Sequence, residues 1–127
     1  GDDFRGGGAL QQGEHILIHA ASGGVGLLAI QFARSLGCII YATTSSERKA
    51  KVLRSYGAHY VFSSRNPESF LSGITQVLGA QKLDLVLNSL TGNFIKYSLE
   101  LLGPNGRFIE LGRTELYNPG ELESEWN

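Results

Sequence analysis

The sequence contains no long apolar run and no cluster of charges of one sign. None of its segments approaches the ~18 consecutive apolar residues of a membrane-spanning helix, and no secretory signal pattern opens the chain. Eleven basic and twelve acidic residues are scattered along the 127 positions, which gives no basic patch for nucleic acid. We therefore expect a soluble protein that binds neither membranes nor nucleic acids.

Cysteine is nearly absent as well. The single Cys38 cannot form an internal disulfide and lies in an apolar context, where a small buried side chain is expected. With one cysteine and no His-Glu cluster, the sequence offers no set of zinc ligands, and no Ser-His-Asp set can be assembled. These absences favour a reducing, cytoplasmic location and argue against a metal site or hydrolase chemistry.

Glycine is the one residue type in excess. The chain has 17 glycines, nearly twice the average usage of about 7%, and most of them fall at separate positions where turns are expected. The length is that of one domain. We expect a single domain over residues 1–127, with residues 1–8 and 118–127 as flexible tails.

Short apolar segments alternate with helical segments along the chain. Strands are expected at residues 15–20, 39–43, 59–62, 84–88 and 107–111. Helices are expected at residues 25–36, 46–56, 67–78 and 93–102, the last one ended by the Gly-Pro-Asn-Gly sequence of residues 103–106. Such alternation is typical of a parallel sheet wrapped by helices. The sequence therefore predicts a doubly wound, Rossmann-type α/β fold with about five to six strands.

The segment that joins the first strand to the first helix is rich in glycine. Residues 21–26 are Ala-Ser-Gly-Gly-Val-Gly, a G-x-G-x-x-G pattern whose first glycine is alanine. In such a turn the backbone approaches a diphosphate at Gly23, the helix packs closely on the strand at Gly26, and free helix amides hold the anion. A plain tight turn is the alternative; a P-loop is excluded, because no Lys-Ser or Lys-Thr follows. We expect the dinucleotide-binding residues of this turn to be Ser22, Gly23, Gly24, Val25 and Gly26.

The end of the second expected strand indicates which dinucleotide binds. An NAD site has Asp or Glu about 20 residues beyond the glycines, whereas this chain has Thr-Thr-Ser-Ser at residues 43–46, followed by Arg48 and Lys49. Hydroxyl groups and a cation favour a 2′-phosphate. We expect NADPH, with Thr44, Ser45 and Lys49 at this phosphate; an ordinary solvated helix face is the alternative for the basic residues. The missing carboxylate also argues against S-adenosylmethionine.

Three segments together resemble one family. They are Leu-Ile-His-Ala-Ala-Ser-Gly-Gly-Val-Gly at 17–26, Asn-Ser-Leu at 88–90 and Gly-Arg-Phe-Ile-Glu-Leu-Gly at 106–112. These segments are similar to the enoyl reductase domains of modular polyketide synthases and animal-type fatty acid synthases, in the zinc-independent, quinone-reductase-like branch of the medium-chain dehydrogenase/reductases. The resemblance covers residues 10–116. It implies NADPH-dependent reduction of the α,β double bond of an enoyl thioester on an acyl carrier protein, with the remaining synthase domains as partners.

The resemblance also implies roles for individual residues. Lys49 and Arg65 match family positions at the 2′-phosphate, and Lys49 is in addition a candidate proton donor and thus a candidate catalytic residue. Four residues at the ends of the fourth and fifth strands would lie against the nicotinamide half: Asn88, Leu90, Leu111 and Gly112. His19, at the end of a buried strand, is expected to be a hydrogen-bonded core residue.

A complete reductase of this family has a second, substrate-binding domain, for which 127 residues leave no room. We therefore expect a nucleotide-binding subdomain that is inactive alone. Other hypotheses are a stand-alone NADP(H)-binding regulatory module, a fragment of a quinone-oxidoreductase-like enzyme, and a degenerate reductase domain that serves as a scaffold.

Overall fold

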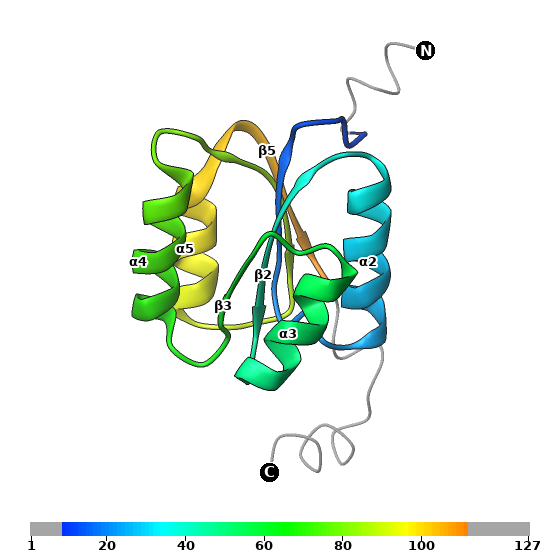
Figure 1. Cartoon of the computed structure of the whole chain (residues 1–127). Helices are drawn as coiled ribbons and strands as arrows, with labels where there is room; N and C mark the ends of the chain where they lie inside the picture. The colour runs from blue at the N-terminus through cyan, green and yellow to red at the C-terminus, as the bar shows by residue number, and fades with distance from the viewer. Residues whose placement is uncertain (1–8, 112–127) are drawn as a thin grey trace.

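The computed structural model describes residues 9–111 as one five-stranded parallel sheet flanked by helices. The strands, in the spatial order β3-β2-β1-β4-β5, are β1 (His15–Ile18), β2 (Ile39–Thr44), β3 (Tyr60–Ser63), β4 (Leu83–Asn88) and β5 (Leu102–Glu110). The helices are α2 (Gly24–Ser35), α3 (Glu47–Tyr56), α4 (Pro67–Leu78) and α5 (Asn93–Leu101). Figure 1 shows α2 and α3 on one side of the sheet and α4 and α5 on the other. The doubly wound Rossmann-type prediction is confirmed; the two expected tails and Gly112 lie outside the described residues.

Both faces of the sheet are covered by apolar side chains. Ile16 and Ile18 of β1 belong to the core beneath α2 and α3, whereas Leu17 between them belongs to the core beneath α4 and α5. Successive strand residues point to opposite faces, so β1 is buried on both sides, as is usual for a central parallel strand. Cys38 is buried with a free thiol, as predicted. No helix within residues 9–111 combines the length and the apolar character that crossing a membrane requires.

The fifth strand is longer than the sequence predicts. Residues 103–106 do not form a separate loop after α5 but are the start of β5, which pairs with β4. The pairing shifts register between Leu83 and Leu85, and a Cβ on Gly106 would lie 2.9 Å from the Leu83 carbonyl oxygen. A β-bulge accommodates extra residues, and glycine permits this close approach of two backbones. The Gly-Pro-Asn-Gly sequence therefore marks an irregular strand start, not the loop we expected.

The first strand ends two residues earlier than predicted, because the backbone turns at Ala20. The φ angle of Ala20 is 50°, and no other non-glycine residue within 9–111 has a positive φ. Helix α2 then begins at Gly24, with Gly23 as its N-cap. A Cβ on Gly26 would lie 2.5 Å from the carbonyl oxygen of Ala21. The helix thus packs directly on the turn at Gly26, as the glycine pattern predicted.

This contact can be tested by comparing two glycines of the same helix. Gly26→Ala should lower the free energy of unfolding by about 1 to 3 kcal/mol, because the added methyl group overlaps backbone that cannot move easily. Gly24→Ala should be neutral or stabilise by up to about 1 kcal/mol, because alanine loses less entropy on folding and a Cβ at Gly24 meets no atom within 4 Å. Urea unfolding measures the free energy of unfolding of both variants, and equal values would contradict the close packing at Gly26.

His19 lies in the interior between β1 and α5. Its Nδ1 is 3.0 Å from Thr43 Oγ1 and its Nε2 is 2.7 Å from Ser98 Oγ. The rings of Phe70 and Phe94 pack against the imidazole edge-on, with centroid distances of 5.2 and 5.6 Å. Burial lowers the pKa of His19 to about 3. The prediction of a hydrogen-bonded core histidine is confirmed, and its ring is neutral at physiological pH.

The lowered pKa of His19 has a measurable consequence. A histidine in the unfolded chain has a pKa of about 6.5, so the unfolded state takes up the proton first as the pH falls. The stabilising contribution of neutral His19 is therefore complete above pH 6.5 and is lost progressively as the pH falls towards 3. NMR titration should show His19 ring resonances that do not move between pH 8 and 5. A midpoint within that range would contradict the assignment.

Candidate functional site

The turn after β1 leaves the start of α2 without a side-chain cap. The N-cap residue, Gly23, has no side chain that could accept a hydrogen bond from the helix amides. The first hydrogen bond of the helix runs from the Leu27 amide to the Gly23 carbonyl at 2.9 Å. The amides of Gly24, Val25 and Gly26 therefore precede the hydrogen-bond ladder of the helix. Such amides, at the positive end of the helix dipole, form a geometry suited to an anion.

The space in front of this turn is open. A Cβ placed on Gly23 or Gly24 would meet no other atom within 4 Å. Val25 is exposed, and Ser22 is half-buried. Helices α3 and α4, by contrast, each follow an N-cap residue whose side chain accepts a hydrogen bond from a first-turn amide, whereas α5, like α2, follows a glycine N-cap without a side-chain hydrogen bond. The start of α2 is thus accessible to a ligand over the residues that the sequence singled out.

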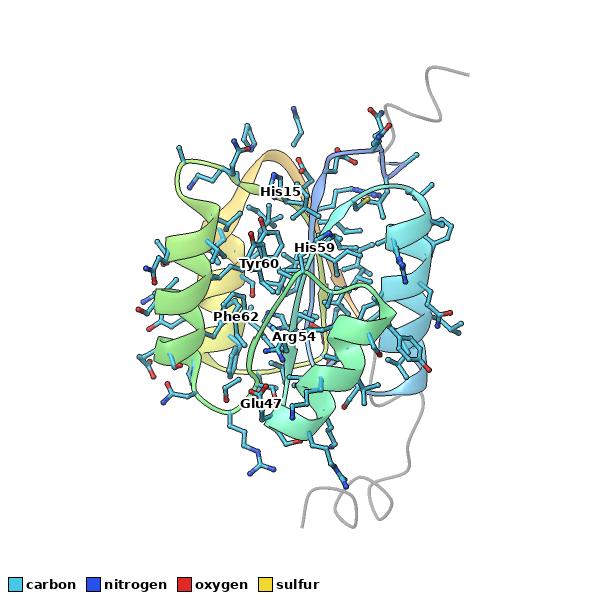
Figure 2. All side chains as sticks on the ribbon, viewed as in Figure 1. His15, Glu47, Arg54, His59, Tyr60 and Phe62 are labelled. Atoms are coloured by element: carbon cyan, nitrogen blue, oxygen red, sulfur yellow. The ribbon has the colours of Figure 1, made fainter. Side chains whose placement is uncertain are left out.

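A second group of predicted residues lies at the end of β2. Thr44 is buried, and its Oγ1 has no hydrogen-bond partner within the described part of the chain. Lys49 extends from the first turn of α3 and donates from Nζ to Ser45 Oγ at 3.3 Å. Next to them lies a hollow of about 230 Å³ between the ends of β2 and β3, lined in part by Thr44, Ser45 and Ser63. Figure 2 shows Glu47, which also lines this hollow, at the opposite end of the sheet from His15.

Arg65 joins this group through the end of β3. The amide of Ser64 donates to the Thr44 carbonyl at 2.8 Å, and the amide of Arg65 donates to Ser63 Oγ at 3.0 Å. These bonds hold the segment after β3 beside the end of β2. Arg65 itself is exposed. The structure therefore brings Thr44, Ser45, Lys49 and Arg65 to neighbouring strand ends, although Arg65 is 16 residues or more from the others in sequence.

The residues predicted for the nicotinamide half lie at the ends of β4 and β5. Asn88 is buried, and its Nδ2 donates to the Leu90 carbonyl and to Glu110 Oε1, both at 2.9 Å. The amide of Leu111 donates to the Asn88 carbonyl at 2.8 Å. The Asn88 side chain is thus engaged inside the protein, where it shapes the loop that contains Leu90. Sequence reasoning missed Glu110 in this role, since nothing local indicates a partner 22 residues away.

The two groups lie on opposite sides of β1. In the strand order, β2 and β3 lie on one side of β1 and β4 and β5 on the other, so the chain changes direction across the sheet at β1. In open α/β sheets, ligands bind at the carboxyl ends of the strands at such a switch point. The turn at Gly23 stands between the two groups. Lys49 belongs to the β2 group and not to the group around Asn88.

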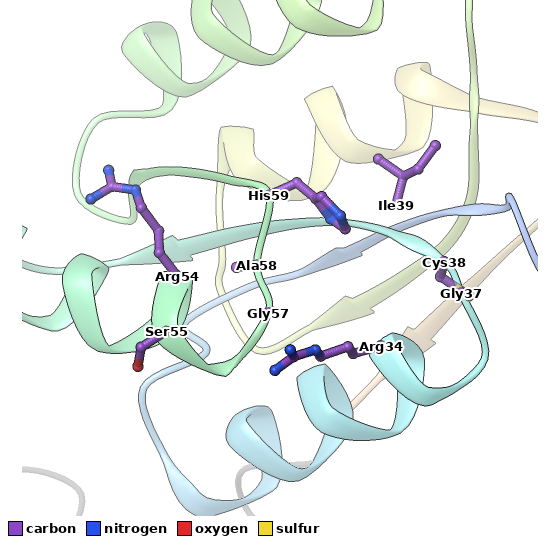
Figure 3. A pocket seen from close by; sticks show the side chains of 9 residues that line it. All are labelled: Arg34, Gly37, Cys38, Ile39, Arg54, Ser55, Gly57, Ala58 and His59. Carbon is purple, nitrogen blue, oxygen red and sulfur yellow. The ribbon is translucent and has the colours of Figure 1, made fainter.

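A larger hollow lies at the other end of the sheet. It has a volume of about 450 Å³ and is lined by residues at the ends of α2 and α3 and the starts of β2 and β3, including Arg34, Arg54 and His59. Figure 3 shows Arg34 and His59 beside it. Both arginines stand in last helical turns, where a cation offsets the negative end of the helix dipole, and His59 Nδ1 accepts from the Ile40 amide at 2.9 Å. These residues have structural roles, so size alone does not make this hollow the site.

Comparison with known proteins identifies the family to which this chain is similar. Residues 24–124 match the family described as "Zinc-binding dehydrogenase". A highly reducing polyketide synthase of Emericella nidulans is 43% identical over 117 residues, which are 90% of this chain and 4% of that protein. The chain thus spans only a small part of this relative.

Solved structures of enoyl reductases are also similar to this chain. The nucleotide-binding subdomain of the enoylreductase domain of PpsC from Mycobacterium tuberculosis has a TM-score of 0.76 and 42% identity, over 85% of this chain and 60% of that one. The CurK enoyl reductase has a TM-score of 0.74 and 39% identity, over 91% of this chain and 34% of that one.

The family description mentions zinc. Within residues 9–111, no group of three or more His, Cys, Asp and Glu side chains is placed to hold a metal ion. These residues therefore do not fit a metal centre. The chain belongs to the zinc-binding dehydrogenase family, as a relative of the nucleotide-binding subdomains of polyketide synthase enoyl reductases.

Proposed function

We propose that this chain binds NADPH as the cofactor-binding part of an enoyl reductase that acts in polyketide or fatty acid synthesis. The observation that carries the proposal is the uncapped start of α2, which faces open space beside a cluster of hydroxyl and cationic groups. We further propose that residues 1–127 form one nucleotide-binding subdomain. The enoyl substrate is then left to the rest of such a reductase.

The diphosphate is assigned to the turn at the end of β1. The amides of Gly24, Val25 and Gly26 would donate to its oxygens, and the Ser22 hydroxyl lies at the same turn. Hydrogen bonds to a charged acceptor are about twice as strong as those between neutral groups. Since a Cβ on Gly23 would project into free space, glycine at this position leaves room for a phosphate against the backbone.

The 2′-phosphate of the adenosine half is assigned to the ends of β2 and β3. Ser45 and Thr44 supply hydroxyl groups, and Lys49 and Arg65 supply positive charge. The unpartnered Thr44 Oγ1 supports the fit, because buried hydroxyl groups are normally hydrogen-bonded. We assign Lys49 to this phosphate and not to proton transfer, because its hydrogen bond to Ser45 holds it on the β2 side of β1.

The nicotinamide half is assigned to the β4 side of β1. Bound NADPH would supply a hydride for the β-carbon of an enoyl thioester, whose α-carbon would take up a proton. The contribution of this chain is orientation. Asn88 fixes the loop through Leu90 by two hydrogen bonds, of 2.9 and 3.3 Å, and Leu111 is anchored to the Asn88 carbonyl. Leu90 and Leu111 would then form the surface under the ring.

The proposed partners follow from the polyketide synthase relatives. An acyl carrier protein would present the enoyl thioester, and the other domains of a synthase would surround this one, as in the large protein of which the chain matches 4%. A cytoplasmic location belongs to the same proposal and is compatible with the free thiol of Cys38.

Cofactor preference tests the 2′-phosphate assignment. We expect NADPH to bind more tightly than NADH in calorimetric titrations. Lys49→Ala or Arg65→Ala should each weaken NADPH by about 1.5 to 3 kcal/mol, the contribution of a hydrogen bond to a charged group, and leave NADH unchanged. Lys51→Ala is the matched control, since Lys51 is an exposed lysine of the same helix. Equal affinity of the wild type for both cofactors would refute the assignment.

The diphosphate assignment is tested at Gly23. Gly23→Val should abolish binding of both NADPH and NADH, because the side chain fills the space reserved for the phosphates. The fold should be retained, since a Cβ at this position meets no protein atom within 4 Å. Circular dichroism checks the fold and calorimetry the affinity. A folded variant that binds NADPH normally would show that the diphosphate lies elsewhere.

A further inference from the structure

We infer that Thr43, held by His19 and Ser98, positions the diphosphate-binding turn for cofactor binding. The inference rests on the proposed function. It concerns buried groups behind the turn that do not touch the cofactor, so these are positioning residues. Their arrangement connects helix α5, strand β2 and the turn after β1 by a continuous series of hydrogen bonds.

Thr43 holds two successive amides of the turn. The Ala20 amide donates to Thr43 Oγ1 at 2.9 Å, and the Ala21 amide donates to the Thr43 carbonyl at 2.8 Å. Ala20 adopts a φ of 50°, a conformation that costs an alanine free energy. The side chain and the backbone of Thr43 thus hold Ala20 and Ala21 in place. Val at position 43 would keep the second bond and lose the first.

The hydrogen-bond directions in this series determine one another. Thr43 Oγ1 accepts from the Ala20 amide and can donate its single proton to His19 Nδ1 at 3.0 Å. With Nδ1 as the acceptor, the neutral imidazole carries its proton at Nε2 and donates to Ser98 Oγ at 2.7 Å; in the other tautomer, Nδ1 donates to Thr43 Oγ1 and Ser98 Oγ donates to Nε2. The pKa of His19, lowered by burial, keeps the ring in this neutral form. In either tautomer the buried ring is hydrogen-bonded to the Thr43 hydroxyl oxygen that accepts from the Ala20 amide.

The residue before the strained position is held as well. The His19 amide donates to the Leu87 carbonyl at 3.0 Å, and Ser89 Oγ donates to the His19 carbonyl at 3.2 Å. Residues 19–21 are therefore attached to β2, to β4 and to the loop after β4. This leaves the turn little freedom to move as a unit.

The position of the turn determines where the first-turn amides of α2, which would bind the diphosphate, are located. Ala21 lies directly beneath Gly26, at a distance that excludes even a methyl group. A displacement of Ala21 would therefore move the first turn of α2. Affinity is gained when binding groups are held in place before the ligand arrives. Thr43 thus acts on binding of the diphosphate, which NADPH and NADH share, and not on recognition of the 2′-phosphate.

The experiment compares three ligands in three variants. We expect Thr43→Val to weaken NADPH and NADH by about tenfold each, as the loss of one hydrogen bond implies, and to leave adenosine 2′-monophosphate, which lacks the diphosphate, unchanged. Thr43→Ser retains the hydroxyl and should restore most of the affinity. Thr75→Val is the matched control, since it removes an exposed hydroxyl that is bonded within α4. Isothermal titration measures all three ligands.

Three results would overturn the inference. They are unchanged NADPH affinity in folded Thr43→Val, an equal loss for adenosine 2′-monophosphate, and a failure of Thr43→Ser to restore binding. If Thr43→Val does not fold, Ser98→Ala replaces it, because it removes the hydroxyl group at the far end of the series. We expect about threefold weaker binding of both dinucleotides by Ser98→Ala, from the loss of one neutral hydrogen bond, and unchanged binding would overturn the inference. If the wild type itself binds no NADPH, the proposed function fails and not the role of Thr43 alone.

Discussion

The contact between the first turn of α2 and the end of β1 determines how the rest of this structure is arranged. Gly26 lets the helix approach the Ala21 carbonyl more closely than any side chain would permit. The helix start therefore lies at the carboxyl end of the central strand. The strands on either side of β1, which are β2 and β3 on one side and β4 and β5 on the other, end around that point. The accessible amides at the start of α2 therefore lie among side chains from the ends of these four strands.

The site combines buried and exposed groups. Behind the turn, Thr43, His19 and Ser98 are fully buried and hydrogen-bonded to one another. In front of it, Lys49 and Arg65 are exposed side chains with long stems. Under the proposed function, a buried framework behind the diphosphate position with exposed charges at its side would suit a ligand of which one part is constant and another part, the 2′-phosphate, decides selection. The fold supplies the framework through buried contacts and the charges through surface residues.

Sequence patterns predicted those features that depend on local physics. The glycine turn and the start of α4 at Pro67 both follow from preferences of single residues for defined backbone positions. The pairing of Asn88 with Glu110 and of His19 with Ser98 did not follow, because each joins residues far apart in the chain. The extended start of β5 was missed for a related reason: glycine and proline normally end an element, and only the neighbouring β4 shows that they form a bulge in this case.

Under the proposed function, the buried Thr44 hydroxyl would connect the supply of cofactor to the stability of the protein. A polar atom that loses water on folding and finds no partner makes the folded state less stable. A ligand that provides the partner removes that cost and shifts the equilibrium away from the unfolded chain. Under the proposed function, the intracellular concentration of the reduced dinucleotide would then set how much of this domain is open to proteases at any moment, and a depleted nucleotide pool would shorten its lifetime.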